Sequence, residues 1–121
     1  MKELTIQDIE TIIHRDESRI LEVKKTTGEL YAGMQSGCAF LNTEGGWLFF
    51  GVHPTTLKIL GQDVVDKTRQ EIAWELCKFS PVIDLAAQYI DVPGRLGKKV
   101  IAVWFPAPVP FTAPYTYDGR P

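Results

Sequence analysis

One short run constrains the fold of this chain more than any other. In Asn42–Gly46, three polar residues and two glycines separate two apolar segments of different periodicity. Before the run, apolar residues recur at helical spacing at Leu30, Met34, Cys38 and Leu41. After it, the letters WLFFGV form a continuous apolar stretch that is typical of a buried strand. The sequence therefore predicts a helix over residues 29–41 that turns sharply into a strand.

The order of these elements excludes a phosphate-binding loop. Such a loop follows a strand and precedes a helix N-terminus, where free N–H groups and the positive end of the helix dipole bind phosphate. Gly45 and Gly46 instead follow a helix C-terminus, whose field favours cations. No GxxxxGK[ST] pattern occurs in the chain. We therefore exclude a Walker-type ATPase and assign Asn42, Gly45 and Gly46 to the structure of the turn.

Two glycines lie inside the predicted helix itself. Gly33 and Gly37 are four residues apart and so share one helix face. Each costs about 1 kcal/mol relative to alanine in a helix interior. We expect that they allow another element to approach the helix closely.

The remaining periodicity predicts two more helices and four further strands. Thr5 is the expected N-cap of a helix over TIQDIETII. Asp63 is the expected cap of a helix that Pro81 ends, with an apolar stripe of Val65, Thr68, Ile72, Leu76 and Phe79. Strands are expected in RILEVKK, LKILGQ, AAQYIDV and KKVIAVWFPA. LKILGQ is expected to form a hairpin with WLFFGV through HPTT. AAQYIDV and KKVIAVWFPA are expected to form a second hairpin across PGRLGK.

These elements predict an α+β fold with two to three helices on a mixed or antiparallel sheet, in two layers. The 121 residues suffice for one domain with its own core, which we expect to span residues 1–121. The aromatic residues of helices and strands, Trp74 among them, are expected in that core. Residues 105–121 form a proline-rich tail that can be neither regular helix nor central strand.

Composition limits the classes of function. The net charge of −2 provides no general basic field, so nucleic-acid binding would need a local basic patch. Cys38 and Cys77 are expected to be buried, reduced thiols, and no metal site is expected at them. MKELTIQDIE lacks the apolar core of a signal peptide, and no apolar run approaches the roughly 20 residues that cross a bilayer. We therefore expect a cytoplasmic protein without a membrane partner.

Four motifs follow one another in a characteristic order. They are ESRILEVKK, CAFLNTEGGWLFFGV, ILG, and a helix ending in Ser80 and Pro81 before VIAVWFPAPVPFTAPYTYDGRP. In this order they resemble the Schlafen AlbA-type domain, also called AlbA-2 and formerly the divergent AAA domain. The resemblance covers the chain from about Glu17 to its end. It implies an AlbA-like fold and the N-terminal part of a longer bacterial transcriptional regulator, because the family pattern continues with another strand.

The resemblance also implies nucleic-acid binding, with DNA or RNA as the partner of a homodimer. AlbA-like domains contact the nucleic-acid backbone through a basic hairpin, which corresponds here to PGRLGKK. The residues expected to make these contacts are Lys24, Lys25, Arg95, Lys98 and Lys99. An ordinary solvated hairpin explains the same charges equally well. Tyr115 and Tyr117 in the tail are expected to stack on a base, to pack against the sheet or to pack against a partner chain.

An acidic cluster leaves a second function open. Glu22 and Lys24 point to one side of a strand, and Glu17 lies just before it. Carboxylates beside a lysine can bind Mg²⁺ or Mn²⁺ and orient a water against a phosphodiester. In the Schlafen proteins that cleave RNA, the matching glutamates act with an aspartate, where this chain has His53, a poorer ligand for a hard cation. No catalytic residue is therefore firm.

Three interpretations of the acidic cluster remain open from the residues alone. Glu17 and Glu22 can serve a metal-dependent ribonuclease, or Glu22 and Lys24 can be a solvated pair on a strand. Glu22 can also anchor the glycine turn by accepting backbone N–H groups. A different class of function, a dimerisation or interaction module that binds no nucleic acid, is favoured by the negative net charge.

Overall fold

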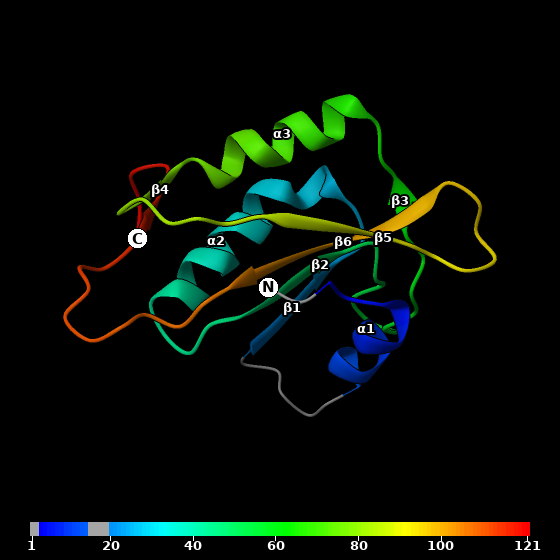
Figure 1. The fold of residues 1–121 in the computed structure, drawn as a ribbon, viewed down its shortest axis with the longest axis horizontal. Helices are drawn as coiled ribbons and strands as arrows, with labels where there is room; N and C mark the ends of the chain where they lie inside the picture. Colours follow the sequence, from blue (N-terminus) through cyan, green and yellow to red (C-terminus); the bar gives the residue numbers. More distant parts are fainter. Residues whose placement is uncertain (1–2, 15–19) are drawn as a thin grey trace.

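The computed structural model describes residues 3–14 and 20–121, and a mixed β-sheet lies at its centre (Figure 1). β1 (Leu21–Lys24) runs parallel to β2 (Gly46–Phe50). β2 is antiparallel to β6 (Lys98–Phe105), and β5 (Ala87–Asp91) pairs with the opposite edge of β6. The long strand β6 thus connects the two halves of the sheet.

Two short pairings complete the strands. β3 (Gln62–Asp63) follows β2 along the same edge of β6 and pairs with Lys98 and Lys99. β4 (Phe79–Ser80) and β7 (Thr116–Tyr117) form a separate antiparallel pair. The proline-rich tail therefore contributes one two-residue strand and no strand of the central sheet.

Three α-helices cover the sheet. α2 (Leu30–Leu41), which follows a 3-10 turn η2 (Thr27–Glu29), and α3 (Asp66–Leu76) lie on one face. α1 (Ile6–Ile13) lies on the other face. Among the described residues, no helix combines the length and the apolar character that crossing a membrane requires.

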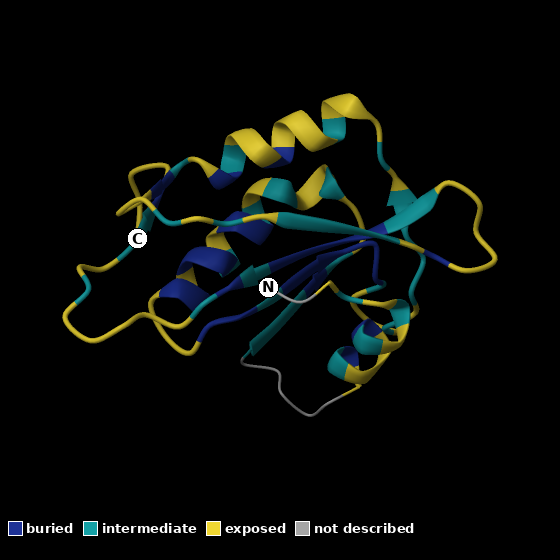
Figure 2. Cartoon of the chain, in the orientation of Figure 1, coloured by how far each residue is buried: buried dark blue, intermediate teal, exposed yellow. Residues whose placement is uncertain are grey.

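The buried side chains form one cluster on each face of the sheet. Figure 2 shows that the buried residues lie along the central strands and on part of α2. On the α2 side, Leu48 and Phe50 of β2 pack with Ile101, Val103 and Phe105 of β6. On the α1 side, Ile9, Ile13, Val23, Phe49 and Val100 pack together. The predicted α+β class with a mixed sheet is confirmed, and α1 adds a third layer over part of the second face.

The helix starts follow from local side-chain chemistry. The Thr5 hydroxyl accepts the Asp8 N–H, and the Asp8 carboxylate accepts the Thr5 N–H, which together form a capping box. The prediction of Thr5 as the N-cap of α1 is therefore confirmed. At η2, the Thr26 hydroxyl accepts the Gly28 N–H and begins the turn that leads into α2.

The glycines of α2 allow the helix to lie directly on the sheet. A Cβ at Gly37 would lie 2.3 Å from the Phe105 ring, and a Cβ at Gly33 would lie 2.8 Å from the Phe50 ring. Both phenylalanines are fully buried, so the rings have little room to move. The expected close approach is confirmed.

Two expectations about residues 57–66 are wrong. LKILGQ is not a continuous partner strand of β2. Ile59 forms a single antiparallel bridge with Val52, and the Gly51 carbonyl accepts the N–H groups of both Leu60 and Gly61. Gln62 belongs to β3, which pairs with β6. Asp63 does not cap α3 but lies in β3. α3 begins after Val65, whose backbone N–H donates to the hydroxyl of Thr68 at 3.2 Å.

The surface of α3 also differs from the expectation. The helix ends at Leu76, before Pro81, and Phe79 belongs to β4. Val65 and Trp74 are 61% and 71% exposed, so neither belongs to the core. Cys38 is buried as expected, whereas Cys77 is exposed at the end of the helix. Only Ile72 and Leu76 of this helix are buried, because α3 touches the sheet along a narrow stripe.

Asn42 and Tyr117 attach the tail to the body of the domain. The Asn42 side chain donates to the Tyr115 carbonyl at 3.0 Å and accepts the Tyr115 N–H at 2.7 Å. Tyr117 is buried, and its hydroxyl donates to the Glu75 carboxylate, which also accepts from Lys78 at 2.8 Å. Of the three expectations for Tyr117, packing within the domain is correct, and its burial contradicts both base stacking and packing on a partner chain.

These contacts also shift the ionisation of the groups that make them. Burial raises the pKa of Tyr117, and its hydrogen bond to Glu75 raises it further. Burial alone would raise the pKa of Glu75, but the hydrogen bonds from Lys78 and Tyr117 outweigh it and lower that pKa overall. Glu75 therefore stays ionised and holds the tail to α3 through a charge-assisted hydrogen bond.

We predict that Gly37→Ala destabilises the domain by about 1–3 kcal/mol, because overpacking against Phe105 exceeds the gain in helix propensity. Urea denaturation followed by circular dichroism measures the change. Gln35→Ala, at an exposed position of the same helix, is the control and is expected to be neutral. A Gly37→Ala variant as stable as the wild type would contradict the close packing of α2.

We predict that Asn42→Ala lowers the free energy of unfolding by about 1–2 kcal/mol, because two hydrogen bonds to the tail can no longer form. Amide hydrogen exchange at Tyr115 is expected to accelerate with it. Asn42→Asp keeps the side-chain acceptor but not the donor, so its free energy of unfolding is expected to lie between those of the wild type and Asn42→Ala. Unchanged exchange at Tyr115 in Asn42→Ala would show that the tail is held by other interactions.

Candidate nucleic-acid interface

The sheet topology brings two distant basic segments to one end of the molecule. Because β1 is parallel to β2 and β2 is antiparallel to β6, β1 ends where β6 begins. Lys24 and Lys25 therefore lie at the same end of the sheet as the turn at residues 92–97. That turn protrudes beyond the helices at the right of Figure 1.

A side chain from β3 joins these two segments. The side-chain Oε1 of Gln62 accepts the Thr27 N–H at 2.8 Å, and the side-chain Nε2 donates to the Thr27 hydroxyl at 3.0 Å. In the sheet, Gln62 is paired with Lys99. The turn that follows Lys25 is thus held beside the first residues of β6.

The hairpin between β5 and β6 is closed by its own backbone. Val92 donates to the Lys98 carbonyl at 3.0 Å, and Arg95 donates to the Val92 carbonyl at 3.1 Å. Arg95 and Leu96 lie at the tip and are exposed, Leu96 completely. The tip thus presents one cationic and one apolar side chain to the solvent.

Two of the predicted contact residues have acidic partners. Lys98 is 3.0 Å from the Asp63 carboxylate, and Lys99 forms an ion pair with Asp91, its cross-strand neighbour. The two aspartate side chains are 79% and 82% exposed, so solvent screens both pairs. Within residues 3–14 and 20–121, neither Lys24, Lys25 nor Arg95 has an ion-pair partner. The five predicted residues therefore lie at one end of the sheet, but the charges of Lys98 and Lys99 are balanced by aspartates in the free chain.

The structure describes only part of the acidic cluster that the sequence suggested. Glu22 lies on β1, and its carboxylate accepts the Ser36 hydroxyl of α2 at 2.9 Å. This contact joins β1 to α2 and differs from the anchoring of the glycine turn that the sequence suggested. Glu17 lies outside the described residues. Among the residues that are described, no three His, Cys, Asp or Glu side chains come together as a metal site.

His53 shapes the loop after β2. Its Nδ1 accepts the backbone N–H groups of Thr55 and Thr56, at 3.1 and 3.2 Å. A carboxylate can make the same contacts in a turn of this kind. Because Nδ1 is already an acceptor for two amides, this nitrogen is not free to bind a cation.

The turn residues act in different ways. Asn42 ends α2 and reaches the tail, as described above. Gly45 has φ +75°, in the left-handed region that favours glycine. At Gly46 the constraint is space, because a Cβ would lie 2.8 Å from the Ile20 carbonyl oxygen.

The sequence did not reveal an apolar groove between α3 and β5. Its volume is about 560 Å³, and its lining includes Arg69, Ile72, Ala73 and Leu76, which share one helix face. Across the groove, the Arg69 guanidinium lies 4.1 Å from the centroid of the Tyr89 ring. Burial raises the pKa of Tyr89, and the charge of Arg69 opposes part of that rise. Residues 69, 72, 73 and 76 have the spacing of one helix face, so the sequence could have indicated that they lie together. Periodicity does not show which part of such a face the rest of the domain leaves uncovered.

The comparisons with known proteins identify the family and the fold of this chain. The family model described as Schlafen, AlbA_2 matches residues 17–120. No curated protein matches the chain. Among solved structures, the crystal structure of the DIP2311 protein from Corynebacterium diphtheriae is similar, with a TM-score of 0.53 and 19% sequence identity over 93% of this chain. That likeness shows the fold alone.

The similar structure is also much longer. The match covers only 23% of the DIP2311 chain, so this chain corresponds to a minor part of that protein. The family match, by contrast, spans most of this chain and includes α2, the glycine turn, β2 and the β5–β6 hairpin. The chain therefore belongs to the Schlafen AlbA_2 family.

Proposed function

We propose that this domain binds nucleic acid, mainly through the phosphate backbone, at the end of the sheet formed by Lys24, Lys25, Arg95, Lys98 and Lys99. We call these residues the hairpin face. The observation that supports this function is the topology, which joins the end of β1 to the protruding hairpin through Gln62. A patch built from two segments suits a strand of phosphates better than a single anion.

The ion pairs on the hairpin face are compatible with binding. Asp63 and Asp91 are exposed, and exposed pairs contribute only about 0–1 kcal/mol. A phosphate can therefore replace either aspartate at a small energetic cost. The release of counterions from the nucleic acid then provides the favourable term, which weakens as salt increases.

The biological setting is also a proposal. The domain acts as the DNA-binding part of a bacterial transcriptional regulator in the cytoplasm, and it does so as a homodimer. β1 and β5 lie at the two edges of the described sheet, where a second copy can pair. RNA remains the alternative nucleic acid, because backbone contacts alone do not distinguish the two.

No contact of the described residues favours a ribonuclease. The Glu22 carboxylate is engaged by Ser36, and the Nδ1 of His53 is engaged by backbone amides. A metal centre on Glu22 would require Glu17, which the structure does not describe. The dimerisation module that binds no nucleic acid remains the outcome to expect if the hairpin face fails its test.

We predict that Arg95→Ala and Lys25→Ala each weaken binding to fluorescein-labelled DNA and reduce the salt dependence. The slope of log K against log salt is expected to fall by about 0.7–0.9 for each phosphate that the variant no longer neutralises. Fluorescence anisotropy at several salt concentrations measures it. Arg120→Ala is the control, because it removes the same charge one residue before the C-terminus, which lies at the opposite end of the domain in Figure 1. It is expected to keep the wild-type slope.

The result of this test decides the proposal. If Arg95→Ala and Lys25→Ala keep the wild-type slope of log K against log salt, as the Arg120→Ala control is expected to, the hairpin face does not contact the nucleic-acid backbone. A wild-type domain that binds neither DNA nor RNA at low salt would exclude nucleic-acid binding altogether.

We predict that Glu22→Gln binds labelled RNA as tightly as the wild type, within about twofold, because Glu22 lies on β1 and its carboxylate is occupied by Ser36. RNA incubated with either protein and Mn²⁺ is expected to remain intact on a denaturing gel. Mn²⁺-dependent cleavage by the wild type that disappears in Glu22→Gln would replace this proposal with the ribonuclease.

A further inference from the structure

The groove between α3 and β5, which we call the α3 groove, is a concave surface that the hairpin face does not include. Its volume of about 560 Å³ lies in the range of ligand sites. The lining is mainly apolar and includes Ile72, Ala73, Leu76, Phe79, Leu85 and Ala87. Ala73 is exposed, and Val82 at the margin is almost fully exposed. The groove is therefore open to a ligand from solvent.

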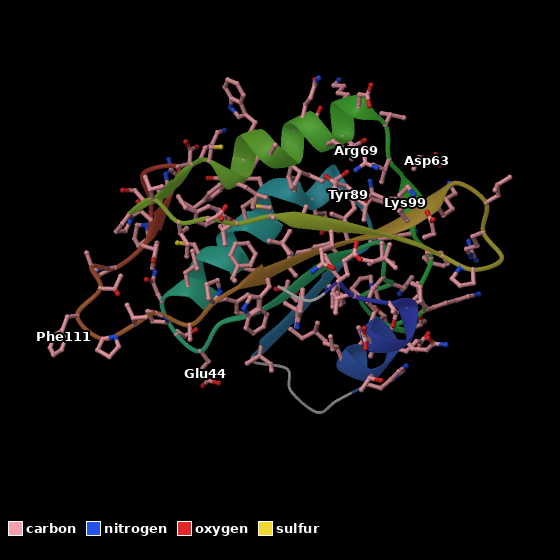
Figure 3. All side chains as sticks on the ribbon, viewed as in Figure 1. Glu44, Asp63, Arg69, Tyr89, Lys99 and Phe111 are labelled. Carbon is pink, nitrogen blue, oxygen red and sulfur yellow. The ribbon has the colours of Figure 1, made fainter. Side chains whose placement is uncertain are left out.

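One end of the α3 groove leads to the hairpin face. Tyr89 and Asp91 lie on the same side of β5, and Asp91 is paired with Lys99 across the strands. Figure 3 shows Arg69 and Tyr89 between α3 and the sheet, with Lys99 next along toward the hairpin. Arg69 thus adds a cationic side chain to the groove near the Asp91–Lys99 pair of the hairpin, and Asp84 is the one acidic residue among the described residues of the groove lining.

The Arg69–Tyr89 contact prepares a stacking surface. The guanidinium lies over the ring at 4.1 Å from its centroid, within the range of a cation–π contact. A base can stack on an arginine plane or an aromatic ring in single-stranded recognition. The N–H groups of Arg69 that the ring does not use can contact the adjoining phosphate.

We propose that the α3 groove receives an unpaired base of a single-stranded nucleic acid whose backbone continues onto the hairpin face. This inference rests on the proposed function and adds a preference for single strands. A duplex hides its bases, and extruding one of them costs a few kcal/mol of unstacking. Duplex and single strand therefore share the hairpin face, but only the single strand uses the groove.

The first experiment changes the ligand and leaves the protein intact. Fluorescence anisotropy compares a labelled oligothymidylate with an abasic strand of equal length and charge. We expect the base-containing strand to bind at least about fivefold more tightly, since stacking of one base is worth that much or more. Equal affinities would overturn the inference, because binding would then depend on the backbone alone.

The second experiment fills the groove. Ala73→Phe places a ring in the groove from an exposed position, so the core is not disturbed. We expect it to weaken single-strand binding at least about fivefold and to leave duplex binding unchanged. Gln70→Phe adds the same ring to an exposed position of α3 outside the groove and is expected to bind as the wild type does. Circular dichroism verifies that both variants are folded.

The outcomes separate this inference from the proposed function. If the wild type binds no oligonucleotide at low salt, both fail. If Arg95→Ala weakens binding but Ala73→Phe matches Gln70→Phe, the hairpin face stands and the groove inference is overturned. If Ala73→Phe alters only self-association in sedimentation velocity, the groove belongs to a second copy of the chain, which also overturns the inference.

Discussion

The close packing of α2 on the sheet is the contact on which the rest of the structure depends. Gly37 lies against the ring of Phe105 and Gly33 against that of Phe50, so one helix touches both central strands. Ser36, on the same helix, binds Glu22 of β1 and holds the edge strand in place. With α2 so near the sheet, the chain must reverse within a few residues, which explains the tight turn and the left-handed Gly45.

The hairpin face and the α3 groove adjoin each other at β5, where Asp91 is paired with Lys99 and Tyr89 lines the groove. The hairpin face exists because parallel pairing of β1 with β2 brings Lys24 and Lys25 to the start of β6. The groove exists because α3 covers the sheet only through Ile72 and Leu76 and leaves the side toward β5 open. Asp63 and Asp91 balance Lys98 and Lys99, whereas Lys24, Lys25 and Arg95 have no ion-pair partner among the described residues, so an acidic chain still carries a local cationic site.

Sequence reasoning succeeded where the determinant was local. Thr5 caps α1 because its hydroxyl and Asp8 are three residues apart, and the Gly33–Gly37 spacing indicated a close approach. It failed where a distant partner decided the result. Asp63 looked like a helix cap, but pairing with β6 placed it opposite Lys98 instead. Trp74 looked like a core residue, but nothing described in the structure covers that side of α3.

The sequence by itself determined the α+β class, the glycine turn, the main helices and strands, and the family resemblance, because these depend on periodicity and on motifs of adjacent residues. Only the tertiary structure decided which charges meet. Lys99 acquired Asp91 as a partner through strand register, and Arg69 acquired Tyr89 through the packing of α3. Strand register and helix packing bring together residues that are distant in the chain. Local sequence patterns do not predict these contacts, because the energy of each contact depends on both partners at once.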